Sequence, residues 1–376
     1  MSPRSAANAT RETILAAQAL SCRRVAAGAA PAWARGLRVS LPESVWSHLE
    51  RGEGPPIGAD AIHEMRLLAA YTDNAPLSSR LPFSYQYAPA WARTLLAGLL
   101  GRWQRRREDN WARFPVWPLD LSADFLADAL QPSRSPHAAG PTPVILSHDL
   151  DSPEGLRNLV ADFLDVEERA GARSVNFVVP CAWPLDHRLL AELRGRGHEI
   201  GVHGYDHSNR TPFAGAEERA RRLNAAREFI DRYSVAGYRA PSLLRTRALI
   251  QGLSGLYRYD SSVPTSGGLF PVPNNGCATA RPFVLDGMSE LPVSLPRDGS
   301  LLFLGHAPGE IARLWIECAE TISRSGGVVV LLTHCEARFS GGREMRAAYR
   351  EFLDYVRSSD RFRFSTPLEV LSRTQP

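Results

Sequence analysis

Short apolar runs alternate with longer amphipathic segments from residue 143 to the end of the chain. The apolar runs predict buried strands at residues 143–146, 174–179, 198–202 and 328–332. Apolar residues at helical spacing predict helices at residues 156–166, 187–196, 214–233 and 343–357. Strands that alternate with helices indicate a parallel sheet. We therefore expect an α/β fold whose sheet closes, or nearly closes, into a barrel with its functional site at the carboxyl ends of the strands.

The first 140 residues lack this alternation. Ala-rich or helically spaced stretches predict helices at residues 11–30, 44–51, 60–71, 89–104 and 121–130. Residues 131–143 are rich in Pro, Ser, Ala and Gly, which is typical of a linker. We therefore predict a mainly helical N-terminal extension at residues 1–140 that packs on a barrel domain at residues 141–376.

Four tryptophans lie close together in the extension: Trp91, Trp103, Trp111 and Trp117. Aromatic side chains at this density can line a sugar-binding surface, but they more often fill the contact between two packed parts of a protein. We therefore expect them to pack the extension onto the barrel.

The formal net charge of +4 is concentrated in the extension. Residues 1–140 contain 16 Arg and 12 acidic residues, a difference of +4, whereas 28 and 28 cancel in the remainder. This excess is too small to indicate nucleic-acid binding, and no nucleic-acid-binding motif is present. All 44 basic residues are arginines, which excludes Schiff-base chemistry, a lysine general base and a P-loop lysine.

The cysteines and the hydropathy favour a cytoplasmic protein. Five cysteines are scattered without a Cys-x-x-Cys pair, which fits reduced thiols better than a disulfide framework. No run of 18 apolar residues exists, so no membrane span is expected. The N-terminus also lacks the continuous apolar core of a secretory signal.

Polar side chains of the metal-ligand type follow two of the predicted strands. Asp149 and Asp151 come after the first strand, and His203 and His207 come after the strand at residues 198–202. Asp-x-Asp places two carboxylates on the same side of an extended segment. One carboxylate and two imidazoles can hold a metal and leave room for water, and the second carboxylate can then accept a proton from that water.

Five sequence blocks in this order resemble the polysaccharide deacetylases of the NodB homology class, carbohydrate esterase family 4. The blocks are residues 147–155 (Ser-His-Asp-Leu-Asp-Ser-Pro-Glu-Gly), 203–207 (His-Gly-Tyr-Asp-His), 238–241 (Tyr-Arg-Ala-Pro), 290–292 (Glu-Leu-Pro) and 332–334 (Leu-Thr-His). Ser-His-Asp-x-Asp in the first block is most similar to bacterial members encoded with O-antigen or other surface-polysaccharide genes. The resemblance covers residues 141–376 and implies a distorted (β/α)7 barrel of the NodB type.

The resemblance also implies roles for individual residues. Asp151, His203 and His207 would hold one divalent metal ion, with Zn²⁺ expected first and Co²⁺, Ni²⁺ or Mn²⁺ as alternatives. Asp149 would be the catalytic base and Arg239 the residue that holds it ionised. His334 would be the general acid that protonates the leaving amine.

Other positions near the blocks depart from the family pattern. Ser152-Pro153 stands where the family has glycine, Gly204 where it more often has Ser or Thr, and Ser242 where it has an aromatic residue. The backbone N–H of Ser242 can still serve an oxyanion, and Tyr205 is the second candidate for a substrate or oxyanion contact.

Several neighbouring positions have supporting roles in this interpretation. We expect His148 to support the site residues or to be a packing residue and not to be a ligand, and Asp206 and Glu336 to orient His207 and His334. The Gly- and Pro-rich stretch at residues 264–285 is either a loop over the site or an ordered surface loop.

Together these features predict a metal-dependent hydrolase that removes an N-acetyl group from a sugar of a bacterial surface polysaccharide or its precursor. The expected partner is therefore an N-acetylated sugar or glycan, with no nucleic acid. One alternative is hydrolysis of another C–N bond in a small amide, as in allantoinases and formamidases. The other is a sugar-binding module with a degenerate site.

Overall fold

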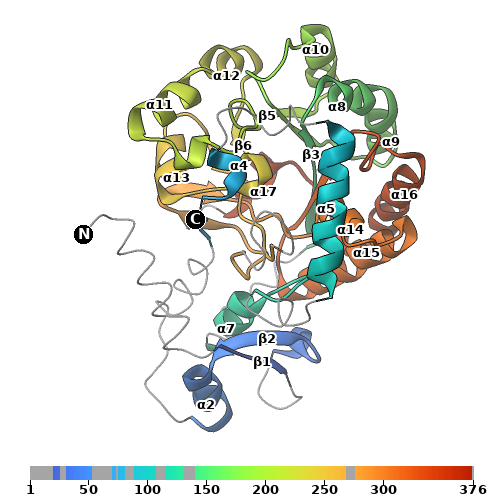
Figure 1. Ribbon diagram of the computed structural model, residues 1–376. Coiled ribbons are helices and arrows are strands. Elements are labelled where there is room, and N and C mark those ends of the chain that lie inside the picture. Colours follow the sequence, from blue (N-terminus) through green and yellow to red (C-terminus); the bar gives the residue numbers. More distant parts are fainter. Residues whose placement is uncertain are drawn as a thin grey trace.

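The computed structural model describes residues 20–25, 31–52, 70–72, 75–80, 89–106, 115–130, 140–267 and 276–374. Within these residues a nine-stranded sheet forms the centre of the molecule and helices surround it (Figure 1). Its strands are β3 (Thr142–Leu150), β4 (Val175–Val178), β5 (Glu199–Val202), β6 (Gly237–Tyr238), β7 (Tyr259–Asp260), β8 (Phe283–Leu285), β9 (Met288–Glu290), β10 (Val329–His334) and β11 (Phe362–Phe364). All strand pairs are parallel except the pair of β8 and β9.

The sheet curls until its two ends approach each other. The strand order is β10-β3-β4-β5-β6-β7-β9-β8, and β11 pairs with β3. The segment after β9 returns to β10, where the Leu295 N–H donates to the Val330 carbonyl at 3.1 Å. The hydroxyl of Ser294 adds a bond to the Val328 carbonyl at 2.8 Å. The predicted distorted (β/α) barrel is therefore confirmed.

The helices that cover the barrel follow the strands in sequence. They are α8 (Pro153–Asn158), α9 (Leu164–Arg169), α10 (His187–Gly195), α11 (Ala216–Asn224), α12 (Arg227–Tyr233), α13 (Arg247–Leu253), α14 (Asp298–Phe303), α15 (Pro308–Ser325), α16 (Arg343–Ser358) and α17 (Pro367–Thr374). The predicted single helix at residues 214–233 is two helices, α11 and α12. No helix in the described ranges combines the length and the apolar composition needed to cross a bilayer.

The N-terminal part supplies β1 (Leu20–Arg24), β2 (Arg38–Pro42), α2 (Glu43–Arg51), α4 (Leu77–Arg80), α5 (Ala90–Arg105) and α7 (Ser122–Leu130). The helices α2, α5 and α7 lie where the sequence predicts them. The helix predicted at residues 11–30 is wrong for 20–24, which pair with β2 in an antiparallel ribbon. This pairing is a tertiary interaction that the local alanine content does not encode. The helix predicted at residues 60–71 lies almost entirely outside the described residues.

Helix α7 fastens this part to the barrel. Its Asp124 accepts hydrogen bonds from the Thr279 hydroxyl at 2.5 Å and the Ala280 N–H at 3.0 Å. The Asp128 carboxylate accepts hydrogen bonds from both terminal nitrogens of Arg281, at 2.8 and 2.7 Å. A domain boundary at residue 140 stays a prediction.

The tryptophans do not all pack as expected. Trp91 is 71% exposed and Trp103 is 53% exposed, so the prediction that they fill the contact with the barrel is wrong. Trp117 is half-buried and packs against the core. Trp111 lies outside the described residues.

Candidate metal centre and active site

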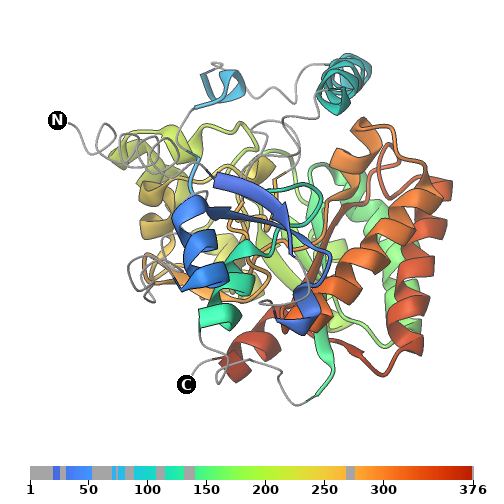
Figure 2. The same cartoon turned by 90° about the horizontal axis from the view of Figure 1, so that it is seen from below.

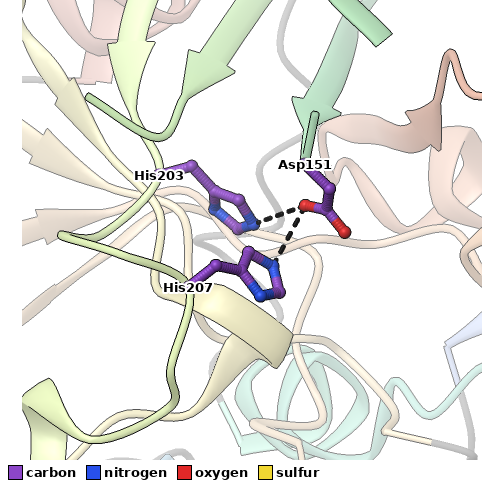
Figure 3. A group of neighbouring side chains, drawn as sticks. All are labelled: Asp151, His203 and His207. Atoms are coloured by element: carbon purple, nitrogen blue, oxygen red, sulfur yellow. Dashed lines mark ion pairs between the residues drawn. The ribbon is translucent and has the colours of Figure 1, made fainter. Parts of the chain in front are cut away.

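The carboxyl ends of β3 and β5 place three metal-ligand side chains together. Asp151 follows the last residue of β3, and His203 follows the last residue of β5. His207 comes four residues later, on the loop that leaves β5, and all three side chains point toward one another (Figure 3). One ligand atom from each residue lies within 4.8 Å of the other two. Parallel strands end at the same edge of a barrel, which is why residues so far apart in sequence meet.

The distances and burial show how these three groups interact. Oδ1 of Asp151 lies 3.4 Å from Nε2 of His203 and 3.0 Å from Nε2 of His207, and all three residues are buried. Burial would raise the pKa of Asp151, but the charge of His207 and the contacts with the His203 and His207 rings outweigh it and hold this pKa well below its ordinary value. Burial would lower the pKa of His203, but Asp149 and Asp151 outweigh it and raise that pKa.

The donor set fits a divalent metal ion. Oδ1 of Asp151 is buried and has no hydrogen bond of acceptable geometry among the described residues. A buried carboxylate oxygen that faces two imidazole nitrogens in this way would otherwise cost free energy. A divalent cation bound by these atoms would supply the positive charge that faces the Asp151 carboxylate. Both histidines would then bind it as neutral imidazoles. Two histidines and one carboxylate leave room for further ligands, as catalytic sites do.

The loop between the two histidines requires a glycine. Gly204 has a φ of +70°, and a Cβ there would lie 2.5 Å from the ring of Pro241. His207 also has a positive φ, of 56°, which is uncommon for a residue with a Cβ. Nδ1 of His203 lies 3.0 Å from the Arg239 carbonyl oxygen, so this contact fixes the ring and leaves Nε2 facing Asp151. The departure at Gly204 therefore has a steric reason.

Asp149 and Arg239 form a buried ion pair beside the three metal-ligand residues. Nη1 of Arg239 donates to Oδ1 of Asp149 at 3.0 Å, and the other carboxylate oxygen lies 3.6 Å from Nε2 of His203. Arg239 also donates to the Ser147 hydroxyl and to the carbonyl and hydroxyl of Ser261, each at 2.9 Å. Its guanidinium lies over the Phe177 ring, 4.2 Å from the ring centroid. Because these four hydrogen bonds fix the guanidinium, Arg239 holds the Asp149 carboxylate in one orientation.

His334 comes from the neighbouring strand and is the register partner of Asp149. Its Nδ1 lies 2.8 Å from Oδ1 of Asp298, and its backbone N–H donates to Oδ2 of the same carboxylate at 2.8 Å. Burial would lower the pKa of His334, but the charge of Asp298 outweighs it and raises the pKa to about 9. His334 is therefore protonated at neutral pH, as a general acid must be.

The prediction that Glu336 orients His334 is wrong, and the role of Asp206 beside His207 stays a prediction. Asp298, on α14, orients His334, whereas Glu336 accepts a hydrogen bond from the Ser152 hydroxyl at 2.7 Å. Asp206 accepts hydrogen bonds from Ser208 and pairs with Arg222 at 3.2 Å. No sequence pattern points to Asp298, because an aspartate at the start of a helix ordinarily indicates only capping.

The remaining candidates have the following places. His148 points away from the three metal-ligand residues, with Nε2 2.8 Å from Glu167 and Nδ1 2.8 Å from the Thr333 hydroxyl, as expected for a packing residue. Ser242 lies in a turn with a φ of 53°. Tyr205 lies under the guanidinium of Arg222, which is 5.0 Å from the ring centroid. The roles of Ser242 and Tyr205 in substrate or oxyanion binding stay predictions.

The departure at Ser152-Pro153 can also be located in the structure. Ser152 caps α8 by accepting the Gly155 N–H at 3.3 Å, and Pro153 occupies the first helical turn. This helix start follows Asp151 directly and stiffens its backbone.

In the stretch at residues 264–285, Thr265 is bonded to Val293 and to Thr279, so both ends are anchored to the barrel. Residues 268–275 lie outside the described residues.

Comparisons with known proteins agree with this architecture. No protein-family model matches the sequence, and no curated protein matches it. Among solved structures, Puue allantoinase superposes with a TM-score of 0.52 at 14% identity, covering 69% of this chain and 99% of its own. A Mycobacterium smegmatis protein assigned as a polysaccharide deacetylase gives 0.48 at 21% identity, covering 63% and 91%. A Pseudomonas aeruginosa PAO1 protein with the same assignment gives 0.48 at 14%, covering 62% and 92%. At these identities the likeness is one of fold.

Proposed function

We propose that this protein is a metal-dependent hydrolase that removes an N-acetyl group from a sugar of a bacterial surface polysaccharide or its precursor. The observation that supports this most is the pairing of Asp149 with Arg239 beside three metal-ligand side chains, with His334 on the adjacent strand. Hydrolysis of an amide needs a base for water and an acid for the leaving nitrogen. Asp149 and His334 supply these two groups at one edge of the sheet.

The residues divide the work as follows. Asp151, His203 and His207 would hold Zn²⁺, which supplies a Lewis acid for the amide carbonyl and lowers the pKa of water. Asp149, held by Arg239, accepts a proton from the attacking water. His334, charged because of Asp298, gives a proton to the leaving amine nitrogen. The backbone N–H of Ser242 and the side chain of Tyr205 are the proposed substrate and oxyanion contacts.

A second candidate keeps this chemistry and changes the substrate to a small amide. Its support is the fold shared with an allantoinase along 99% of that protein's length. The same base and acid would serve a ring amide, so only the choice of substrate separates the two candidates. A sugar-binding module with a degenerate site is less well supported, because the acid, the base and the metal-ligand side chains are all present.

The first test measures metal and product on the same samples. Purified wild type, His203→Ala and Asp149→Asn would be analysed for zinc and other divalent metals and assayed for acetate release from N-acetylated sugars, with allantoin in parallel. We expect near-stoichiometric metal in wild type and Asp149→Asn, little in His203→Ala, and acetate release by wild type alone. His187→Ala is the matched control, because His187 contacts Tyr233 on the surface helices and should keep both properties.

Each outcome decides between the candidates. Ring opening of allantoin without acetate release would select the small-amide hydrolase. If wild type binds no divalent metal after reconstitution, the hydrolytic mechanism is overturned and the sugar-binding module becomes the favoured interpretation.

A further inference from the structure

Helix α5 turns its apolar side away from the protein. Seven large apolar side chains are exposed among the described residues, and five of them lie on this helix. They are Trp91 (71% exposed), Leu95 (58%), Leu96 (58%), Leu99 (53%) and Trp103 (53%). We call these five residues the α5 apolar face. A helix on a globular protein ordinarily has the opposite arrangement, with its apolar side inward.

The opposite side of the helix is seated on the barrel. Gly101 is buried, and a Cβ there would lie 2.1 Å from the Phe303 carbonyl oxygen of α14. Gln104 is buried on the same side. At 100° per residue the five residues of the α5 apolar face fall within roughly 140° of the circumference. The contact with α14 therefore fixes the apolar face outward and does not cover it.

The charge around this face is positive. Helix α5 contains no acidic residue, and its arginines are Arg93, Arg102 and Arg105. Arg102 and the following Arg106 are exposed and fall within the same arc as the apolar residues. Leucines between two tryptophans, with arginines among them, are typical of a helix that lies in the interface of an anionic bilayer.

Contacts with residues near the candidate active site place this face on the same side of the barrel. Figure 2 shows both α4 and α5 above the rest of the protein, and α4 carries another exposed side chain, Leu77 (81%). Ser78 of α4 accepts a hydrogen bond from Asn209, two residues beyond His207, at 3.1 Å.

A chain of contacts also joins α5 to the acid side of the site. Gly101 touches Phe303, the ring of Phe303 lies 5.9 Å from that of Phe339, and the ring of Phe339 lies 4.8 Å from that of His334. The α5 apolar face is therefore fixed in position relative to the acid.

We propose that the α5 apolar face docks this protein on the surface of an anionic phospholipid bilayer. The leucines and tryptophans enter the boundary between headgroups and acyl chains, and Arg102 and Arg106 contact lipid phosphates. Docking in this orientation turns the active-site edge of the barrel toward the bilayer. If the proposed hydrolase function holds, its substrate is a sugar carried on a membrane lipid.

The test measures binding to vesicles and requires no enzymatic activity, so its failure is separate from failure of the hydrolase proposal. Wild type, Leu95→Glu/Leu99→Glu and Val284→Glu would be sedimented with phosphatidylcholine vesicles, with and without phosphatidylglycerol. Val284 is the matched control, because it is 62% exposed on β8. Circular dichroism and metal content would verify that each variant folds.

We expect wild type and Val284→Glu to bind the anionic vesicles, more weakly when salt rises from about 0.1 M to about 0.5 M. The double variant should lose about tenfold or more in bound fraction, because each leucine loses its burial in the bilayer. Equal binding of wild type and the double variant, or no binding of wild type, would overturn the proposal. Concentration-dependent dimerisation of wild type that is lost in the double variant, without vesicle binding, would assign the face to a second copy instead.

Discussion

Nδ1 of His334 lies 2.8 Å from a carboxylate oxygen of Asp298, 36 positions earlier in the chain. Asp298 also accepts the Ser340 hydroxyl at 2.8 Å, the backbone N–H of His334 at 2.8 Å and that of Gly299 at 2.6 Å, so four contacts fix its position. This contact leaves Nε2 as the ring nitrogen of His334 that can face a substrate. Asp298 thus positions the proposed acid and also sets its charge.

Asp298→Asn should shift the alkaline limb of the pH–rate profile to lower pH. Asp298 raises the pKa of His334 to about 9, and an acid acts only while it is protonated. Without the carboxylate the charge of the imidazolium is no longer stabilised, so the rate should fall at a lower pH than in wild type. A bound cation would shift the alkaline limb to lower pH in both wild type and Asp298→Asn. The quantity to compare is therefore the difference between the two proteins in the pH at which the rate falls. Identical limbs would show that His334 does not set the limb.

The same pair should make stability depend on pH in the metal-free protein. The folded pKa of His334, about 9, exceeds its ordinary 6.5, so its stabilising contribution is full below about 6.5 and is lost as pH rises through 9. The pKa of Asp298 is lowered from 3.8, although burial alone would raise it, because the charge of His334 outweighs burial. Its contribution is present above 3.8 and is lost as pH falls.

Urea unfolding of wild type and Asp298→Asn tests this dependence. The difference in the free energy of unfolding should be larger at pH 5.5 than at pH 9.5, two conditions chosen on either side of the shifted histidine pKa. A difference that is the same at both values would contradict the charge coupling between these residues.

Arg239→Met should destabilise the protein by about 3–5 kcal/mol, because it leaves the buried Asp149 carboxylate without its charge partner. Arg239 is fully buried. Arg357→Met is the control, since Arg357 pairs with Asp354 at the surface, where the side chains are 60% and 69% exposed. An exposed pair contributes about 0–1 kcal/mol. Similar costs for both variants in urea unfolding would show that the Asp149–Arg239 pair is not a strong internal constraint.

The sequence predicts the barrel well because buried parallel strands are apolar runs, and β3 and β10 stand out for this reason. The metal-ligand side chains follow such runs directly, so Asp151 and His203 could be found without a structure. Asp298 could not, because its relation to His334 is a tertiary contact without any characteristic spacing. Periodicity likewise shows that Leu95 and Leu99 share one face of a helix, but not whether that face turns inward.

Gly204→Ala should remove the metal as well as destabilise the fold. Alanine at a φ of +70° costs about 1–2 kcal/mol, and its Cβ would lie 2.5 Å from Pro241. Because Gly204 directly follows His203 in the loop that leads to His207, we expect relief of this clash to move at least one of the two imidazoles. Metal affinity should therefore fall by about tenfold or more. Gly171→Ala is the matched control, because Gly171 has a φ of +80° but no atom within 4 Å of a built Cβ. Both variants, Gly204→Ala and Gly171→Ala, introduce backbone strain, but only Gly204→Ala introduces the contact with Pro241. Urea unfolding and metal titration of the two variants therefore separate these two effects. Equal metal affinity in the two variants would show that the loop between the histidines can absorb a side chain without moving them.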